Sequence, residues 1–377
     1  YSQTANVDKN GLAYVVTTGV PFMRIAPDAR SSGMAEAGVA TSADNYSGFH
    51  NPAKFAFIEN DLGASASFAP WLRQITNDIY LMKADGYYKI APDHTAALGI
   101  RYFTLGQINY RDANNNDLGF SKPHEACFEG HYAFRLSESF SIGSSLRFIY
   151  SNLSNGASSS APQIPAGTAF SADIAAFYSK RLDLRNMEEA RLNFGVNISN
   201  VGSKIQYLTV GQQDYIPANL AIGTAFYAKI DQYNAVMGTL QIDKLLVPTP
   251  SYIQDANGDY VISPTYRTQS SMAAIFSSFG DHPEGFGGEL RELILHGGAE
   301  YSYSNTFFAR AGYFYEPESA GGRTFVTLGA GVKYNKLRLD FSYLLPISQQ
   351  RSPLDNQMRI SLGVNVGDSK MKNSNYW

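Results

Sequence analysis

A strict alternation of apolar and polar residues runs through most of this chain. In one segment, Phe140, Ile142 and Leu146 lie on one face, whereas Ser141 and Ser145 lie on the other. Successive side chains of a β-strand point to opposite sides, so a period of two indicates strands and not helices. The chain is therefore predicted to be an all-β protein whose strands each have one apolar and one polar face.

The alternating segments number about fourteen, and turn-forming residues separate them. An even number of antiparallel strands is usual for single-chain barrels of the bacterial outer membrane. We expect strands at residues 61–69, 77–90, 95–107, 125–136, 139–151, 168–180, 190–200, 216–228, 233–243, 293–302, 306–315, 324–334, 336–345 and 357–367.

The composition of the two faces distinguishes a membrane barrel from a soluble sandwich, whose polar face contacts water. Here the polar faces consist of Gly, Ser, Asn and an occasional Arg, and only 17% of all residues are charged. Aromatic residues lie near the ends of the apolar faces, as at Tyr150, Tyr334 and Tyr343, which is typical of an aromatic girdle. Both features favour a 14-stranded antiparallel transmembrane β-barrel.

The connections between the predicted strands alternate in length. Those after even-numbered strands are mostly short, such as 335–336, whereas most after odd-numbered strands are long, the longest being 244–292. Outer-membrane barrels have short periplasmic turns and longer extracellular loops. This rhythm places the long loops outside the cell and both termini in the periplasm. Within the longest loop, Asn257-Gly258 predicts a hairpin turn, and residues 270–279 predict a short apolar helix.

The N-terminal part of the chain does not share the alternation. Residues 19–57 are rich in Ala, Gly and Ser. Small residues let backbones approach closely, which suits a compact segment packed inside a larger structure. We expect an N-terminal segment with a hatch at 1–58, a barrel with long loops at 59–368, and a C-terminal tail at 369–377.

The sequence contains no signature of an enzyme or a metal site. No GxSxG or P-loop is present, no GxGxxG leads from a strand into a helix, and the six histidines lack paired metal-ligand spacing. The run from Asp112 to Asp117 lacks the Gly and Glu of a calcium loop, so it is predicted to be a polar loop. Cys127 is expected to be a small apolar strand residue. The net charge of −3 does not favour nucleic acid. We predict no catalytic activity, no cofactor and no metal.

Several arginines lie on the polar faces of different predicted strands. They could form an internal charge network with carboxylates such as Asp173 and Asp340, or they could line a lumen that binds a ligand. We favour the network, because a narrow barrel fills its own interior with side chains. These arginines are Arg101, Arg147, Arg310, Arg338 and Arg359.

The Ala- and Gly-rich stretch contains a recognisable motif. It includes Arg24 in MRIAPDAR, Gly33 and Gly38 in GMAEAGVAT, and the tripeptide Asn51-Pro52-Ala53. Ahead of fourteen strands, this motif resembles that of the FadL-type outer-membrane barrels. It resembles more closely the PorV family of the type IX secretion system of Bacteroidota, and the related PorQ barrels share much of it. The resemblance spans essentially the whole chain and implies that the segment is a hatch plugging the lumen.

This resemblance implies a carrier and not a pore. Barrels of this family are expected to associate with a large outer-membrane translocon subunit, bind the C-terminal domain of secreted cargo, and deliver it to a sortase-like attachment complex. The implied location is the outer membrane of a Gram-negative bacterium. We expect loops 244–292, 316–323 and 346–356 to make the protein contacts. The predicted apolar anchors are Met272, Ile275, Phe276, Phe279 and Phe286.

Two other functions remain open at this point. In a FadL-type channel for fatty acids or other hydrophobic molecules, Arg101 or Arg147 would hold a carboxylate in the lumen. A continuous apolar cavity with a lateral opening would indicate such a channel, whereas a filled polar lumen would argue against it. The third possibility is a purely structural barrel whose loops only shield the rim.

Overall fold

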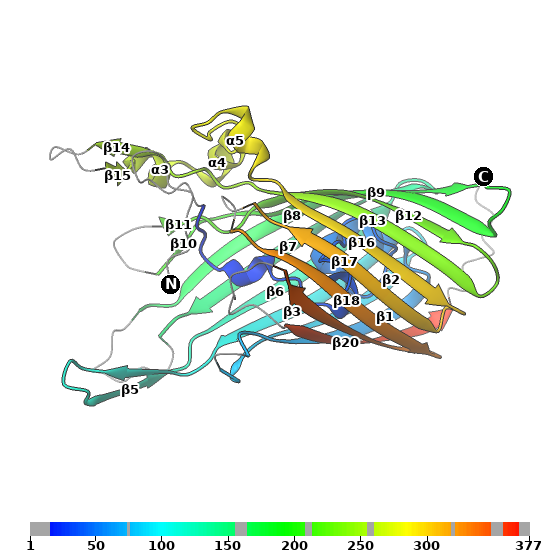
Figure 1. The fold of residues 1–377 in the computed structure, drawn as a ribbon, viewed down its shortest axis with the longest axis horizontal. Coiled ribbons are helices and arrows are strands. Elements are labelled where there is room, and N and C mark those ends of the chain that lie inside the picture. The colour runs from blue at the N-terminus through cyan, green and yellow to red at the C-terminus, as the bar shows by residue number, and fades with distance from the viewer. Residues whose placement is uncertain are drawn as a thin grey trace.

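The protein is a closed antiparallel barrel of fourteen strands (Figure 1). This computed structural model describes residues 16–73, 76–154, 164–207, 213–254, 260–317, 321–347 and 357–368. Each barrel strand pairs with the next one along the chain, and β1 pairs with β20 to close the barrel, from Asn60 opposite Asp368 to Phe68 opposite Ile360. The barrel strands are β1 (Asn60–Pro70), β2 (Ile79–Ala91), β3 (His94–Leu105), β6 (His124–Arg135), β7 (Phe140–Asn152), β8 (Gly167–Leu182), β9 (Glu189–Gly202), β12 (Asn219–Lys229), β13 (Asn234–Leu245), β16 (Ile294–Tyr303), β17 (Phe307–Tyr315), β18 (Thr324–Tyr334), β19 (Leu337–Pro346) and β20 (Met358–Asp368).

All fourteen strands predicted from the alternation are present. The largest difference at a strand end is at β12, which begins at Asn219 instead of residue 216. The polar faces line the interior: Ser145 and Arg147 of β7 are buried, whereas Leu146 between them is 71% exposed on the outside. The prediction of an all-β, 14-stranded antiparallel barrel is confirmed.

The two ends of the barrel differ in their connections. We call the end with the long connections the loop end and the other the turn end. At the loop end lie three two-stranded hairpins and three short helices, which project beyond the barrel on one side of Figure 1. Their bounds are β4 (Ile108–Arg111), β5 (Asp117–Ser121), β10 (Ile205–Gln206), β11 (Gln213–Asp214), β14 (Tyr252–Gln254), β15 (Tyr260–Ile262), α3 (Pro264–Thr268), α4 (Ser271–Ser277) and α5 (Phe286–Leu290).

The local predictions for the loops agree with this arrangement. Strands β14 and β15 pair as expected, although the predicted turn at 255–259 lies outside the described residues. Helix α4 lies within residues 270–279, where a short apolar helix was predicted. Asp112 is a turn residue: its Oδ1 accepts the amides of Asn114 and Asn116, as a polar loop requires.

The N-terminal residues 16–58, which we call the plug segment, lie inside the barrel. They form η1 (Pro21–Arg24), α1 (Ala29–Ser32), α2 (Ser47–His50) and η2 (Pro52–Phe57). Side-chain caps define two of these short helices, because Asp28 accepts the Ser31 amide and Asn51 accepts the Ala53 amide. Within the described residues, no helix is long and apolar enough to cross a membrane.

The plug segment runs through the barrel from one end to the other. At the loop end, the amide of Gly19 donates to the Tyr215 carbonyl at 2.9 Å, and Val16 packs beside Tyr215. At the turn end, Lys89 Nζ donates to the Ile58 carbonyl at 2.5 Å. The expectation that both termini share the turn end therefore finds no support at the N-terminal side. Residues 1–15 and the predicted tail 369–377 lie outside the described residues.

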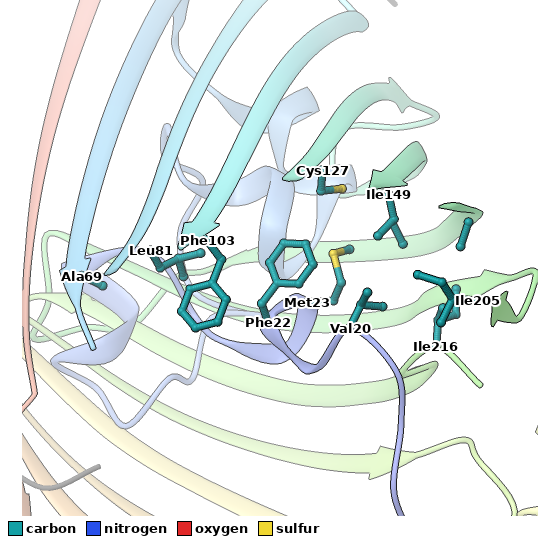
Figure 2. Close-up of a cluster of buried hydrophobic side chains, with 11 residues drawn as sticks. Val20, Phe22, Met23, Ala69, Leu81, Phe103, Cys127, Ile149, Ile205 and Ile216 are labelled. Atoms are coloured by element: carbon teal, nitrogen blue, oxygen red, sulfur yellow. The ribbon is translucent and has the colours of Figure 1, made fainter. Parts of the chain in front are cut away.

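Apolar clusters lie in the lumen near both ends of the barrel. Near the loop end, Phe22 and Met23 of the plug segment pack against inward-facing Leu81, Phe103 and Ile149 of the wall (Figure 2). Near the turn end, a second cluster surrounds the end of the plug segment, and its members are Phe55, Ala56, Ile58, Tyr87, Ala97 and Ala133. Burial of these side chains favours the inserted position of the plug segment over a solvated one.

Candidate functional site

Inward-facing polar side chains hold the backbone of the plug segment. Gln241 Oε1 accepts the amides of Gly38 and Val39 at 2.8 and 2.9 Å, and Ser361 Oγ accepts the Ala29 amide at 2.9 Å. Short helices leave many amides and carbonyls without partners inside the segment, and buried backbone groups need them. The polar face of the barrel supplies these partners.

Glycines on the barrel wall allow the plug segment to approach closely. A Cβ atom at Gly195 would lie 2.1 Å from the carbonyl oxygen of Val39, and one at Gly312 would lie 2.4 Å from the Ala35 nitrogen. Any side chain there would collide with backbone. These glycines on the predicted polar faces thus form part of the wall surface that contacts the plug segment.

One buried charge network lies on the wall formed by β2, β3, β6, β7 and β8. Glu129 accepts from Arg101 at 2.7 Å and from Lys83 at 3.2 Å, and Arg147 pairs with Asp173. Arg101 also donates to the Met23 carbonyl of the plug segment at 3.1 Å. Acid and base side chains therefore neutralise each other inside the barrel, as buried charges must.

A second network lies on the opposite part of the wall and includes the plug segment. Arg30 pairs with Glu300 at 3.1 Å, and Glu300 also accepts from Arg310 at 2.6 Å. Asp340 pairs with Arg310 at 2.8 Å and with Arg338 at 2.8 Å. Arg359 pairs with Glu36 at 2.8 Å. The two networks together engage all five arginines noted in the sequence. The structure shows the internal charge network, including Asp173 and Asp340.

One group of side chains within the described residues has ligand spacing that could suit a metal. Oxygen and nitrogen atoms of Asp85, Glu129 and His131 lie within 4.8 Å of one another. However, Lys83 bonds both carboxylates, and Arg101 bonds Glu129. Because these cations already provide the positive charge that a metal would supply, we assign the group to the charge network.

A small polar cavity of about 70 Å³ lies between the plug segment and the charged part of the wall. Arg101, Asn197 and His296 line it, and each has one buried polar atom without a hydrogen-bond partner in the described part of the chain. A polar space of this size holds a few water molecules, which can complete these hydrogen bonds.

The predicted hatch motif lies in the plug segment, and its charged and small residues contact the wall or pack within the segment. Arg24 forms a long ion pair with Glu316 at 3.9 Å near the loop end. A Cβ at Gly33 would lie 3.1 Å from the Cα of Gly329, and one at Gly38 would lie 2.3 Å from the His50 ring.

The Asn51-Pro52-Ala53 part of the motif turns the chain and fixes it to the wall. Asn51 Nδ2 donates to the carbonyls of Val39 and Ala176, both at 3.0 Å, and Pro52 begins η2. The Ala53 carbonyl accepts from Ser141 Oγ at 2.8 Å. These contacts explain why an amide side chain and a small residue stand here.

The predicted anchor residues belong to the cap, which we define as residues 263–292 at the loop end. Phe276 and Phe286 are 72% and 78% exposed, and Phe279 and Met272 are about half exposed. Ile275 is only 8% exposed and packs against Ala218 and Leu246 of the barrel. Ile275 therefore holds α4 on the barrel, whereas the other four side chains face away from it.

Polar contacts fasten the cap to the rim. The Tyr215 hydroxyl donates to the carbonyls of Tyr266 and Gln269, both at 2.9 Å, and the backbone of Tyr215 holds Gly19 of the plug segment. Lys244 Nζ pairs with Glu289 at 2.8 Å. The sequence analysis did not identify Tyr215 or Lys244, because neither shows a local signal of its distant partners.

One carboxyl group in this interface has no ion pair with the residues that the structure describes. Asp281 Oδ2 accepts the Thr249 amide at 3.1 Å. Burial raises the pKa of Asp281 to about 6, and the nearby carboxylates of Glu292 and Glu289 act in the same direction. In contrast, the hydrogen bond from Lys244 lowers the pKa of Glu289 despite its partial burial. The cap thus contains a carboxyl group whose pKa is raised well above its usual range.

The fold is a closed 14-stranded barrel with an N-terminal segment inside its lumen. Solved structures of similar fold include a deletion mutant of the monoaromatic hydrocarbon channel TodX (11% identity, 90% of this chain and 99% of that chain, TM-score 0.53). The toluene transporter TodX of P. putida is similar (11%, 91% and 99%, TM-score 0.51). So is the toluene transporter TbuX of Ralstonia pickettii (12%, 90% and 98%, TM-score 0.50). At such identities the likeness concerns the fold alone.

The sequence itself matches one family. A family model described as "Type IX secretion system protein PorV" matches residues 8–252, and the chain belongs to this family. No curated protein matches the chain. The resemblance seen in the N-terminal motif is confirmed.

Proposed function

We propose that this protein is an outer-membrane carrier of the type IX secretion system. It associates with the large translocon subunit, binds the C-terminal domain of secreted cargo through its loop end, and delivers the cargo to the sortase-like attachment complex. The family match supports this role. The observation that carries the proposal is the combination of a filled lumen with a cap that exposes several large apolar side chains.

The exposed side chains of the cap suit protein recognition. Phe276 lies in α4, Phe279 lies in the turn after α4, and Phe286 begins α5, so the three side chains are presented on a support held at the barrel rim. Exposed aromatic residues gathered in one loop favour contact with another surface, and aromatic anchors dominate binding energy at interfaces. The described part of loop 316–323 lies at the same end. Most of loop 346–356 lies outside the described residues.

The filled lumen is the reason to prefer a carrier to an uptake channel. Arg101 and Arg147, which would hold a carboxylate in a channel, are both engaged in buried ion pairs. The plug segment contacts the wall at the loop end, in the middle and at the turn end. A hydrophobic substrate would have to displace all of these contacts to pass.

The orientation in the membrane follows from the connections. We propose that the loop end faces the outside of a Gram-negative cell, as expected for Bacteroidota, and that β20 ends on the periplasmic side. We also propose that residues 59–368 form the membrane-embedded domain and that residues 1–58 serve as its hatch.

Gentle purification from the native membrane, followed by mass spectrometry of what accompanies the protein, tests this proposal. We expect a very large barrel subunit, or secreted proteins that share a C-terminal domain. The variant F276S/F279S/F286S should lose these partners while the barrel still folds, as should deletion of residues 268–288. The matched control is L184S/I230S, because Leu184 and Ile230 are exposed at the turn end.

The outcomes separate the hypotheses. Partners that remain bound to the cap variants would contradict the assignment of the cap. Purification without protein partners but with acyl chains that depend on Arg101 or Arg147 would favour the uptake channel. Absence of both protein partners and bound acyl chains would favour a purely structural barrel.

A further inference from the structure

One short segment at the loop end touches both the plug segment and the cap. It consists of residues 215–218, which follow β11 and lead into β12, and we call it the junction segment. All four of its residues are buried. Connecting segments at the surface of a protein usually contact water. The burial of this one therefore means that other parts of the chain cover it.

The plug segment covers one side of the junction segment. The amide of Gly19 donates to the Tyr215 carbonyl at 2.9 Å. Ile216 belongs to the same apolar cluster as Val20, and Figure 2 shows the two side chains together. A Cβ at Gly19 would lie 2.5 Å from Cγ2 of Ile205 in β10, so the chain leaves no room for a side chain there. The start of the plug segment thus fits closely against this part of the rim.

The cap covers the other side. The Tyr215 hydroxyl lies 2.9 Å from the carbonyl oxygens of both Tyr266 and Gln269, and the rings of Tyr215 and Tyr266 meet edge-on at 5.9 Å. Ala218 shares an apolar cluster with Ile275 of α4. Tyr215 therefore bonds the plug segment through its carbonyl group and the cap through its hydroxyl group.

The two halves of the junction segment differ in what holds them. The barrel wall holds the second half, because Asn200 Nδ2 donates to the Pro217 carbonyl at 3.1 Å and the Leu246 amide donates to the Ala218 carbonyl at 2.7 Å. At the first half, the hydroxyl and the ring of Tyr215 contact the cap. Tyr215 is thus the point at which a movement of the cap reaches the plug segment.

The plug segment and the cap also share apolar burial around Tyr215. Val16 of the plug segment and Ala274 of α4 pack in one cluster with Tyr215, and Ala274 is only 1% exposed. A cap that moved away would expose this cluster to water, which costs free energy in proportion to the apolar area exposed. Separation at this point therefore removes contacts of both segments at once.

We propose that the cap and the first part of the plug segment, residues 16–25, form one cooperative unit joined by Tyr215. Lifting of the cap releases the Tyr215 side chain and exposes the hydrogen bond that holds Gly19. Proteins open locally in such cooperative units, and segments that share contacts are coupled through these openings. The coupling is reciprocal, so displacement of the start of the plug segment loosens the cap by the same factor.

This coupling goes beyond the carrier function, because it is a property of the free protein and needs no partner. One consequence does rest on the proposed function: a partner that displaces the cap would loosen the plug segment at the loop end. The contacts of the plug segment with Gln241 and Lys89 would still hold it further inside the barrel. The coupling can fail while the cap variants still lose their partners, and the reverse also holds, so the two proposals are tested separately.

Hydrogen–deuterium exchange of the full-length protein in detergent tests the coupling. Tyr215→Phe removes a hydroxyl group that bonds the cap and keeps the ring and the carbonyl group that holds Gly19. We expect amides of α4 and also those of residues 19–25 to exchange about three- to tenfold faster. Tyr110→Phe is the matched control, because its hydroxyl lies 3.0 Å from Ser121 Oγ in the β4–β5 hairpin, also at the loop end.

Gly19→Ala tests the coupling from the other side. The three atoms nearest to the new Cβ belong to Ile205, Asp214 and Tyr215, none of which is part of the cap. Exchange in α4 should nevertheless become faster by a similar factor. Faster exchange confined to the substituted side in either variant would overturn the proposal, as would unchanged exchange of both segments in Tyr215→Phe. Acceleration that extends to β18 would show general destabilisation and would also overturn it. Heat-modifiable migration of each variant checks folding.

Discussion

At the scale of single residues, inward-facing glycines determine how closely the plug segment approaches the wall. Gly195 leaves room for the Val39 carbonyl, at a distance where a methyl group would overlap it. Neither backbone can retreat freely, because Gln241 holds the Val39 amide from another strand. Packing at this position is therefore intolerant of one added carbon atom.

Gly195→Ala should destabilise the inserted plug segment, because the new Cβ would displace the backbone of Val39. Overpacking of this kind costs about 1–3 kcal/mol. We expect a lower thermal midpoint and faster proteolysis of the plug segment. Gly238→Ala is the matched control, since a Cβ at Gly238 meets nothing within 4 Å. Equal behaviour of the two variants would contradict the close-contact argument.

The pKa of Asp281 makes docking of the cap depend on pH. Its folded pKa of about 6 lies above the ordinary value of about 3.9, so the docked cap binds a proton more tightly than an undocked one. This contribution is fully present below about pH 4 and is lost as the pH rises to about 6. With allowance for solvent screening, we expect about 1 kcal/mol.

Amide exchange in α4, corrected for its intrinsic pH dependence, measures this effect. Protection should fall between pH 4 and 6 in the wild type and stay level in Asp281→Asn, which keeps an acceptor for the Thr249 amide. The same slope in both proteins would show that another group is responsible.

At the scale of elements, the plug segment is bound to the wall by a buried ion pair and not by apolar contact alone. The side chains of Arg30 and Glu300 are only 4% and 10% exposed. Arg30 also pairs with Asp44 at 2.6 Å within the plug segment. The same guanidinium thus fixes the shape of the segment and its position in the barrel.

Arg30→Met should destabilise the protein, because Asp44 loses its closest cationic partner in a buried site. Breaking a buried pair costs about 3–5 kcal/mol, and we expect the lower value since Glu300 keeps Arg310. Arg191→Met removes the exposed pair with Glu189 and should change stability by less than about 1 kcal/mol. Chemical denaturation in detergent compares the two, and similar losses would refute the assignment.

The elements differed in how far the sequence could predict them. Strands such as β7 were located closely because one face contacts lipid and the other the lumen, so the sequence itself alternates. The helices of the plug segment have no such period, since nearly all of their sides are buried. The ion pairs were only partly foreseen. Asp173 was named as a partner, whereas Glu129 and Glu300 depend on strand register and on the path of the plug segment, which no local pattern encodes.

At the scale of the whole molecule, the interior is arranged in levels. Apolar clusters lie at both ends, and charge networks and a small polar cavity lie between them. The sequence analysis described polar strand faces of Gly, Ser, Asn and Arg and did not name the inward-facing apolar residues Phe103 and Ile149 near the loop end, although their register could have been counted from the alternation. Because the cap lies outside the lumen that the plug segment occupies, binding of a partner at the cap does not require an open pore.

The plug segment begins at the loop end, so its first described residues should be accessible from outside the cell. Val16 and Thr17 lie at the loop end, on the same side as the cap, whereas Lys336 lies in the turn between β18 and β19 at the turn end. Thr17 and Lys336 are both exposed. If the loop end faces outward, a label that cannot cross the membrane distinguishes the two positions.

In a Cys127→Ala background, Thr17→Cys should react with a membrane-impermeant maleimide on intact cells, and Lys336→Cys should react only after permeabilisation. Cys127 is fully buried. Its replacement leaves each variant with a single cysteine, at the position that is tested. Reaction of Lys336→Cys but not Thr17→Cys on intact cells would reverse the orientation and remove the cap from the cell surface. Reaction of both Thr17→Cys and Lys336→Cys only after permeabilisation would instead show that the plug segment does not begin at the loop end. The experiment therefore tests the membrane orientation and the path of the N-terminal chain separately.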